Sequence, residues 1–306
     1  MTASARPLNL LLCVAIGVAA AIVGLLPWIV TGMRLPLQNA WAAAVMPDDM
    51  PIALLPFSPY TLILMAGMLV TGAAVGGTAG RLLRRRLPRG GVSAIAGGVL
   101  AVQVLAVVQT SVAVLGGLRQ DVEGRLYFAA ILGAIVLSVL LGALTLWLVA
   151  VAPRAGAVIG FTLAALAAEQ WAAGLIVAPF SISATPFALW LAAALRWLPS
   201  VAVGIAIAWC GLRTVGGAVA AVGSLLFLWV APATTSAIGM AAGTRVYWRF
   251  PAEMLAAARG VFVSALMIPS LSLLPVVLAL TVAAVGLVWR RSARSARAAG
   301  AVTPSA

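Results

Sequence analysis

The chain contains no histidine and no lysine, and only six of its 306 residues are acidic. With no histidine and two cysteines, Cys13 and Cys210, it offers too few ligands for a zinc site or for a haem held by two histidines. A Ser-His-Asp triad is excluded on the same ground. We therefore expect no metal and no cofactor. An enzyme is the least favoured class, because Glu169, Asp48 and Asp49 are its few acid/base candidates.

Charge of either sign is scarce. Charged residues make up 8% of the chain, hydrophobic residues 64%, and the mean hydropathy is +1.17, whereas a soluble protein carries roughly a quarter charged residues. The apolar residues form repeated runs of about 20, the length that crosses a bilayer as a helix. The pattern predicts an all-α, polytopic integral membrane protein.

We predict eight transmembrane helices in a single domain, residues 1–289, and a basic tail, residues 290–306, that we expect to be disordered. The predicted spans are residues 8–30, 60–80, 92–115, 127–152, 157–178, 187–212, 215–231 and 261–289.

Prolines complicate three of these predictions. The stretch 187–212 is either one long span kinked at Pro199, which we prefer, or an interfacial helix followed by a short span. Pro232 is expected to close the seventh span. Pro269 and Pro275 are expected to break or kink the eighth.

Orientation follows from a loop of five arginines between the second and third spans, which should stay in the cytoplasm. This choice places both termini inside, together with 12 of the 19 arginines and none of the acidic side chains. We interpret the loop as a topology determinant, with a docking site for a protein partner as the alternative. Its arginines are Arg81, Arg84, Arg85, Arg86 and Arg89.

The net charge of +13 suggests a partner. Because most arginines fall on the predicted inner side, we expect the anionic headgroups of membrane lipid there, and no nucleic acid. The composition, rich in Ala, Gly and Arg, indicates a GC-rich genome, so we expect the cytoplasmic membrane of a bacterium. No nucleotide-binding motif is present, so ATP-driven transport would need a separate ATPase.

Two long segments are predicted outside, residues 31–59 and 233–260. Within the first, Met33–Met46 is expected to form an amphipathic surface helix. Within the second, an interfacial helix is expected to begin at Pro251. A Pro-Phe-Ser string recurs before the second and sixth spans, at Pro56 and Pro179, which suggests a weak 4+4 parallel repeat.

Glu169 is the only acidic residue well inside a predicted span, and Arg196 falls at nearly the same depth on the next helix. An ionisable group inside the membrane is costly and so suggests function. Either the two residues pair near mid-membrane, or Arg196 lies at the interface and Glu169 is protonated and hydrogen-bonded, for example to Gln103. These readings are weighted equally.

Two further polar groups are candidates for a substrate or proton pathway. Gln103 and Thr110 share one helix face, where hydrogen bonds between helices are the favoured reading and a polar pathway the alternative. Ser270 and Ser272 lie in the proline-rich stretch 269–275. Broken helices line transporter sites, but they also occur as plain architecture.

These features together favour a transporter- or permease-like protein of unknown substrate, either a carrier or the membrane subunit of a transport complex. The alternative is a non-transporting membrane scaffold or accessory protein that acts through its two external segments.

Overall fold

The computed structural model describes residues 8–181, 183–244 and 250–300, with side chains described up to residue 293. Regular structure in these residues is helical. In chain order the elements are α1 (Leu10–Ile29), η1 (Pro47–Asp49), η2 (Pro59–Thr61), α2 (Leu62–Leu82), α3 (Gly91–Gly117), α4 (Val122–Ala150), α5 (Arg154–Ile176), α6 (Pro186–Leu195), α7 (Leu198–Cys210), α8 (Val215–Gly243), α9 (Pro251–Met267) and α10 (Pro269–Gly300).

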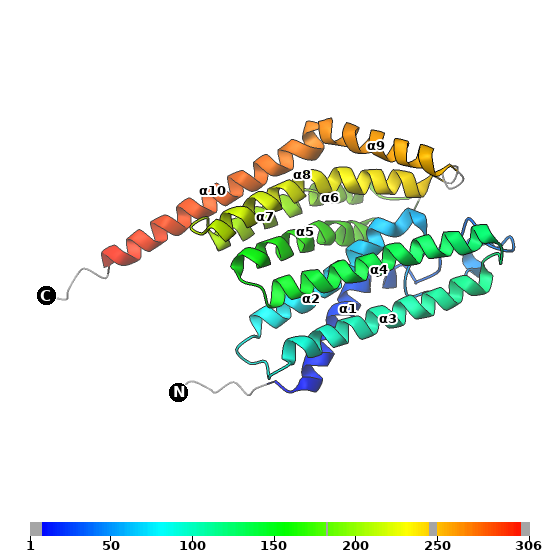
Figure 1. The fold of residues 1–306 in the computed structure, drawn as a ribbon, viewed down its shortest axis with the longest axis horizontal. Helices are drawn as coiled ribbons and strands as arrows, with labels where there is room; N and C mark the ends of the chain where they lie inside the picture. The colour runs from blue at the N-terminus through cyan, green and yellow to red at the C-terminus, as the bar shows by residue number, and fades with distance from the viewer. Residues whose placement is uncertain (1–7, 182, 245–249, 301–306) are drawn as a thin grey trace.

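The long helices run side by side, so the loops gather at two ends (Figure 1). One end holds the α2–α3, α4–α5 and α7–α8 turns and the C-terminal part of α10; we call it the arginine-rich end. The opposite end holds residues 30–61 and the starts of α4 and α9; we call it the acidic end. Helices α1–α4 pack together, and α5 contacts α2 and α4 on one side and α7 and α8 on the other.

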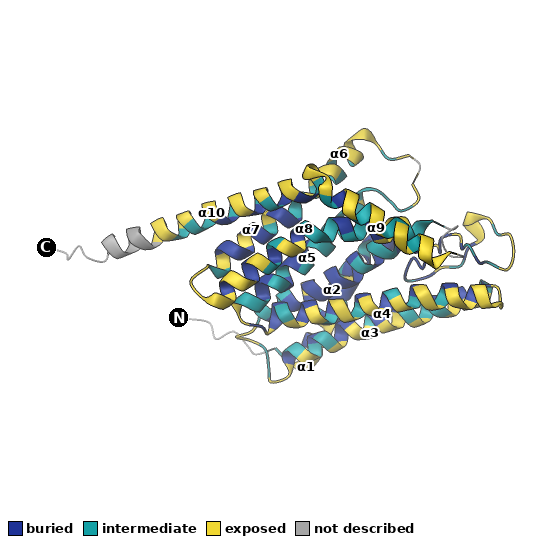
Figure 2. Ribbon diagram, turned by 45° about the horizontal axis from the view of Figure 1, so that its top comes forward, coloured by how far each residue is buried: buried dark blue, intermediate teal, exposed yellow. Residues whose placement is uncertain are grey.

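Eight stretches of the described chain are long and apolar enough to cross a membrane, with α6 and α7 counted together. Exposed residues run along α3, α4 and α10 (Figure 2). Large apolar side chains are among the exposed residues of α3, α4, α8 and α10, for example Leu105, Leu137, Val219 and Val285. Monomeric proteins in water rarely expose apolar surface of this extent. The chain is therefore an all-helical, multi-pass membrane protein, and its orientation and internal repeat remain predictions.

Small residues allow the backbones of the first helices to approach closely. A Cβ added to Gly17 in α1 would overlap the carbonyl of Ile95, and one added to Gly98 in α3 would overlap the carbonyl of Val14. Gly24 meets Gly72 of α2 in the same way. Close approach of this kind is how helices associate in lipid, where apolar burial gives little advantage over the acyl chains.

The prediction of a surface helix at Met33–Met46 is wrong. This stretch is irregular and lies within a segment, residues 30–61, that we call the cap segment. Its backbone does not form helical hydrogen bonds. Instead, Arg34 pairs with Ile52 in an isolated antiparallel bridge. Leu35 is only 2% exposed and packs in the core that joins the cap to α1–α4. The apolar residues taken for an amphipathic stripe are therefore buried.

The sixth predicted span is interrupted, and not at Pro199. Helix α6 ends at Leu195 and α7 begins at Leu198, so the break falls at Arg196 and Trp197. Pro199 lies in the first turn of α7, where a missing N–H leaves no hydrogen bond unmade. The two helices together still form one 25-residue stretch long and apolar enough to cross a membrane, so the single span stands, with its interruption in the turn that precedes Pro199.

The seventh span does not end at Pro232, because α8 continues to Gly243. Pro232 has no N–H to bond the carbonyl of Leu228, four residues earlier in α8. Membrane helices tolerate proline where nearby hydroxyl side chains and neighbouring helices satisfy the disturbed backbone groups. This prediction failed because proline was read as it acts in water-exposed helices.

The eighth predicted span is two helices. Helix α9 begins at Pro251, as expected, and α10 begins at Pro269 after a break at Ile268. Pro275 lies inside α10 and does not end it. The disordered tail predicted from residue 290 is also wrong as far as Gly300, since α10 continues through it; alanine and arginine are strong helix formers. Residues 301–306 lie outside the described part.

Candidate functional site

Glu169 lies in the C-terminal half of α5, about 22 Å along the helix from its start at Arg154 at 1.5 Å per residue. It is half-buried and falls on the face that carries Val158 and Thr162, at intervals of four and seven residues. Val158 packs in the core formed with α7, α8 and α10. Glu169 therefore lies on the face of α5 that packs toward α7, α8 and α10.

Arg196 does not form a contact ion pair with Glu169. The ion pairs found between described residues join Arg119 to Asp121 and to Glu123, with N–O distances of 3.4 and 3.3 Å. The Arg196 guanidinium interacts with Glu169 electrostatically over a longer distance. Its near neighbour is the ring of Trp197, whose centroid lies 4.9 Å away. Arg196 is exposed at the C-terminal end of α6, where the helix break turns the chain.

Three buried polar atoms on α7 and α8 have no hydrogen-bond partner in the described part of the chain: Ser200 Oγ on α7, and Ser224 Oγ and Trp229 Nε1 on α8. Both serines are fully buried. Buried hydroxyls normally find a partner, so each unpartnered atom calls for an explanation. None of the three atoms bonds to the Glu169 carboxylate; what they share with it is the region where α5 contacts α7 and α8.

Sequence reasoning missed these three groups. A serine or tryptophan in an apolar run commonly bonds the preceding helical turn or lies at an interface, so the residue type carries no signal. Depth along the helix was the only available hint, since Trp229 lies about 21 Å from the start of α8 by helical rise, close to the depth of Glu169.

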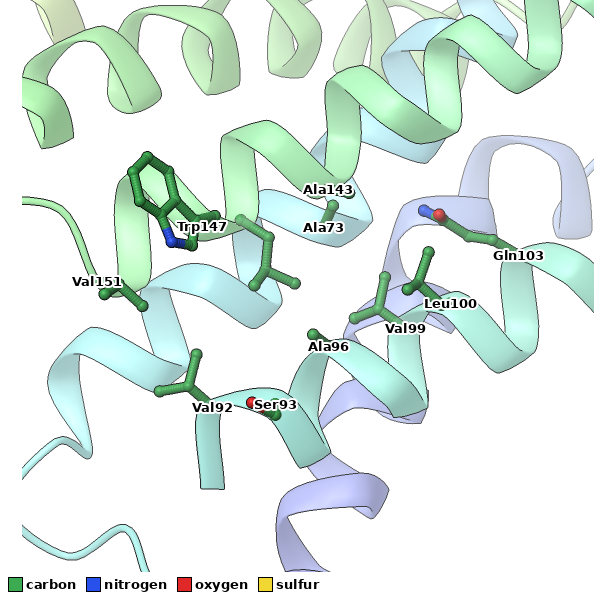
Figure 3. A pocket seen from close by; sticks show the side chains of 11 residues that line it. Ala73, Val92, Ser93, Ala96, Val99, Leu100, Gln103, Ala143, Trp147 and Val151 are labelled. Carbon is green, nitrogen blue, oxygen red and sulfur yellow. The ribbon is translucent and has the colours of Figure 1, made fainter. Parts of the chain in front are cut away.

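Gln103 has a partner other than Glu169. Its Nε2 donates to the carbonyl oxygen of Leu69 at 2.8 Å, a hydrogen bond from α3 to α2, while its Oε1 is buried without a partner. The side chain lies at one end of a cavity of about 300 Å³ between α2, α3 and α4, with Val92 and Ser93 at the other end and Trp147 across it (Figure 3). The remaining lining is apolar.

Thr110 holds the cap segment. Its Oγ1 accepts a hydrogen bond from the backbone N–H of Leu55 at 3.0 Å, and the neighbouring Gln109 accepts one from Leu54 at 2.9 Å. Gln109 also donates to the carbonyl of Ile52 at 3.0 Å. This polar stripe of α3 therefore satisfies backbone groups of the cap segment.

The two serines of the last span behave differently. Ser272 is buried, and its Oγ lies 2.9 Å from the carbonyl oxygens of Leu266 and Ile268, so it satisfies the backbone at the α9–α10 break. Ser270 is exposed. Neither serine contacts Gln103 or Thr110. Gln103 bonds α2, and Thr110 bonds the cap segment.

The arginine loop divides into two parts. Arg81 belongs to α2, and its Nε and Nη2 donate to the carbonyls of Val149 and Ala152 at 2.6 and 2.7 Å, at the C-terminal end of α4. The four others, Arg84, Arg85, Arg86 and Arg89, lie after the helix with exposed side chains. Among the described residues, Arg81 is therefore the arginine of this loop whose side chain bonds another helix.

Comparison with protein-family models, with curated protein sequences and with solved structures finds no match to this chain.

Proposed function

We propose that this membrane protein is transporter-like, a carrier or the membrane subunit of a transport complex in the cytoplasmic membrane. Its substrate or proton pathway would follow the contacts of α5 with α7 and α8. The observation that carries the proposal is Glu169, the one acidic side chain well inside a candidate span of the described chain. It is half-buried and has no contact ion pair among the described residues. Such a carboxylate is costly in a membrane, and a working role for its proton or charge explains it.

Each residue of this pathway takes a defined role. Glu169 exchanges a proton or binds a cationic group of the substrate. The exposed Arg196 tunes that charge from a distance. The unpartnered groups Ser200, Ser224 and Trp229 supply hydrogen bonds along the route. The chain is also discontinuous at Arg196–Trp197 and at Ile268, and discontinuous helices line the sites of many transporters.

The test is proton movement in proteoliposomes that enclose a pH-sensitive dye, driven by an imposed potassium diffusion potential. The wild-type protein should acidify the lumen faster than protein-free vesicles do. Glu169→Gln should reduce the rate to that of protein-free vesicles and leave the melting temperature unchanged. The matched control is Glu253→Gln, which removes an exposed carboxylate from the first turn of α9 and should retain wild-type flux. Equal flux in Glu169→Gln and wild type would remove Glu169 from the pathway.

If the wild-type protein moves no protons, a second experiment tests whether it is the membrane subunit of a transport complex. Purification in mild detergent from the native host, with mass spectrometry of what stays bound, should then yield a stoichiometric ATPase or second membrane protein. A protein that purifies alone and moves no protons would contradict both the proton-exchange role of Glu169 and the complex-subunit form of the proposal.

The second candidate is a membrane scaffold or accessory protein. It is supported by the order of the cap segment, where the Trp28 indole donates to the carbonyl of Ala53 at 2.8 Å and Phe57 is fully buried. A fixed platform of this kind presents exposed Leu37, Met46 and Ile52 to a partner. Loss of function on replacing those three residues by serine, with Glu169→Gln silent, would favour the scaffold.

A further inference from the structure

Two arginines from different helices face the same indole at the arginine-rich end. The guanidinium carbons of Arg81, on α2, and Arg154, at the start of α5, lie 5.4 and 5.8 Å from the ring centroid of Trp209. Trp209 lies in the last turn of α7, and the edge of its ring meets Phe161 with the centroids 6.2 Å apart. Cations within about 6 Å of an indole face are attracted by its quadrupole. The indole therefore has two guanidiniums within about 6 Å of its ring.

A third arginine approaches the same turn from α10. Arg290 donates through Nη1 to the backbone carbonyls of Ala208 and Trp209, the latter at 2.7 Å. Cations at the C-terminal end of a helix are stabilised by its dipole. Arg290 and Arg81 are each fixed at a helix end, so Arg81, Arg154 and Arg290, which we call the Trp209 cluster, form a fixed arrangement of three positive charges.

The protein supplies no side-chain carboxylate to neutralise this cluster. The chain has six acidic residues. Asp48, Asp49, Asp121, Glu123 and Glu253 lie in η1 and at the starts of α4 and α9, at the acidic end, and Glu169 lies within α5. Arg84 and Arg154 instead act on Arg81 as like charges. Like charges held together without a partner repel, so the site gains most from an anion supplied from outside.

Hydrogen-bond donors also remain in the cluster. Arg81 uses Nε and Nη2 on backbone carbonyls, which leaves Nη1. Arg290 uses Nη1, which leaves Nε and Nη2. Among the described contacts, Arg154 has the Trp209 ring but no hydrogen bond, so its whole guanidinium edge remains. Guanidinium edges match the oxygen atoms of a phosphate in charge and geometry.

We propose that the Trp209 cluster binds the phosphate of an anionic phospholipid in the leaflet at the arginine-rich end. The lipid source follows from the surroundings: exposed Leu212, Val215 and Trp289 lie on the same end of α7, α8 and α10 and present apolar surface beside the charges. Trp at such a level is typical of the membrane interface. The site is distinct from the transport pathway and does not depend on it.

The experiment is native mass spectrometry of the detergent-purified full chain titrated with phosphatidylglycerol, and separately with phosphatidylcholine of the same acyl chains. The wild type should retain phosphatidylglycerol in preference. The double variant Arg154→Gln/Arg290→Gln should bind phosphatidylglycerol about tenfold more weakly, the scale of losing charge-assisted hydrogen bonds to one phosphate. The control Arg85→Gln/Arg89→Gln removes the same charge from exposed loop positions and should bind as the wild type does.

Three results would overturn the proposal. Equal retention of the two lipids by the wild type would show that the headgroup charge is not read. Equal weakening by the two double variants would assign the effect to diffuse surface charge. Displacement of phosphatidylglycerol by inorganic phosphate, with sodium chloride of equal ionic strength inactive, would make the cluster a site for soluble anions. If Arg154→Gln/Arg290→Gln does not fold, Arg154→Gln alone replaces it, since the exposed Arg154 side chain has only the ring contact.

Discussion

The phenol of Tyr127 donates its hydrogen to Gln38 Oε1 at 2.8 Å, joining the second turn of α4 to the cap segment. Gln38 is 8% exposed, and its Nε2 donates to the carbonyls of Pro36 and Phe57 at 2.6 and 2.7 Å. One side-chain amide therefore ties two parts of the cap segment to the helix bundle. A buried amide whose donors and acceptor are all engaged specifies a single arrangement of the groups around it.

Tyr127→Phe should lower the free energy of unfolding by about 1–3 kcal/mol, because it leaves the buried Gln38 oxygen without its donor. The measurement is thermal unfolding in detergent. The matched control is Tyr60→Phe, since the half-exposed Tyr60 hydroxyl has a contact to Asn39 at 3.5 Å, near the limit for a hydrogen bond. An equal or greater loss for Tyr60→Phe would contradict this account of the cap.

A second prediction concerns adjacent residues of α3. Thr110→Val should destabilise the cap segment by about 1–3 kcal/mol, because the backbone N–H of buried Leu55 loses its acceptor. Ser111→Ala should be close to neutral, since Ser111 Oγ is buried without a partner. Proteolysis within residues 30–61, followed by mass spectrometry, should speed up for Thr110→Val alone. Unchanged proteolysis would mean that Thr110 does not hold the cap.

Sequence patterns predicted the helices better than the segments between them. Runs of about 20 apolar residues located the first five spans to within a few residues, because bilayer thickness fixes length and composition together. The cap segment defeated the same reasoning. Its order depends on contacts between residues far apart in the chain, such as Tyr127 with Gln38, and no local period encodes such contacts.

Prolines misled the prediction for a physical reason. Pro199 and Pro269 stand in first turns of helices and Pro232 and Pro275 inside them, so one residue type marks either a helix start or an uninterrupted helix. The choice depends on whether other helices or hydroxyl side chains satisfy the backbone. Glu169 was accessible from sequence because a lone charge in an apolar run is conspicuous, whereas the Trp209 cluster was not, since it joins α2, α5, α7 and α10.

Arg81 should matter more for stability than the other arginines of its loop. Arg81→Gln removes two hydrogen bonds to the end of α4 and the contact with the Trp209 ring, and should cost about 1–3 kcal/mol. Arg85→Gln removes the same charge from an exposed position and should change stability by less than about 0.5 kcal/mol. The comparison is made by melting temperature at fixed detergent and salt. Equal effects would indicate that the loop acts only through its net charge.

Neighbouring glycines of α3 should respond to alanine with opposite signs. A Cβ at Gly98 would overlap the carbonyl of Val14 and lie 3.1 Å from the Cα of Gly17, so Gly98→Ala must push α1 away from α3 and should cost about 1–3 kcal/mol. At Gly97 no atom lies within 4 Å of the added Cβ, and Gly97→Ala should gain about 0.5–1 kcal/mol from helix propensity. Because the two positions share one helix and nearly one depth, lipid and detergent effects cancel in the difference. If the melting temperature falls equally in both variants, the loss comes from the α3 backbone and not from the α1–α3 contact. A fall for Gly98→Ala alone would show that the close approach of α1 and α3 at Gly17 and Gly98 contributes to stability.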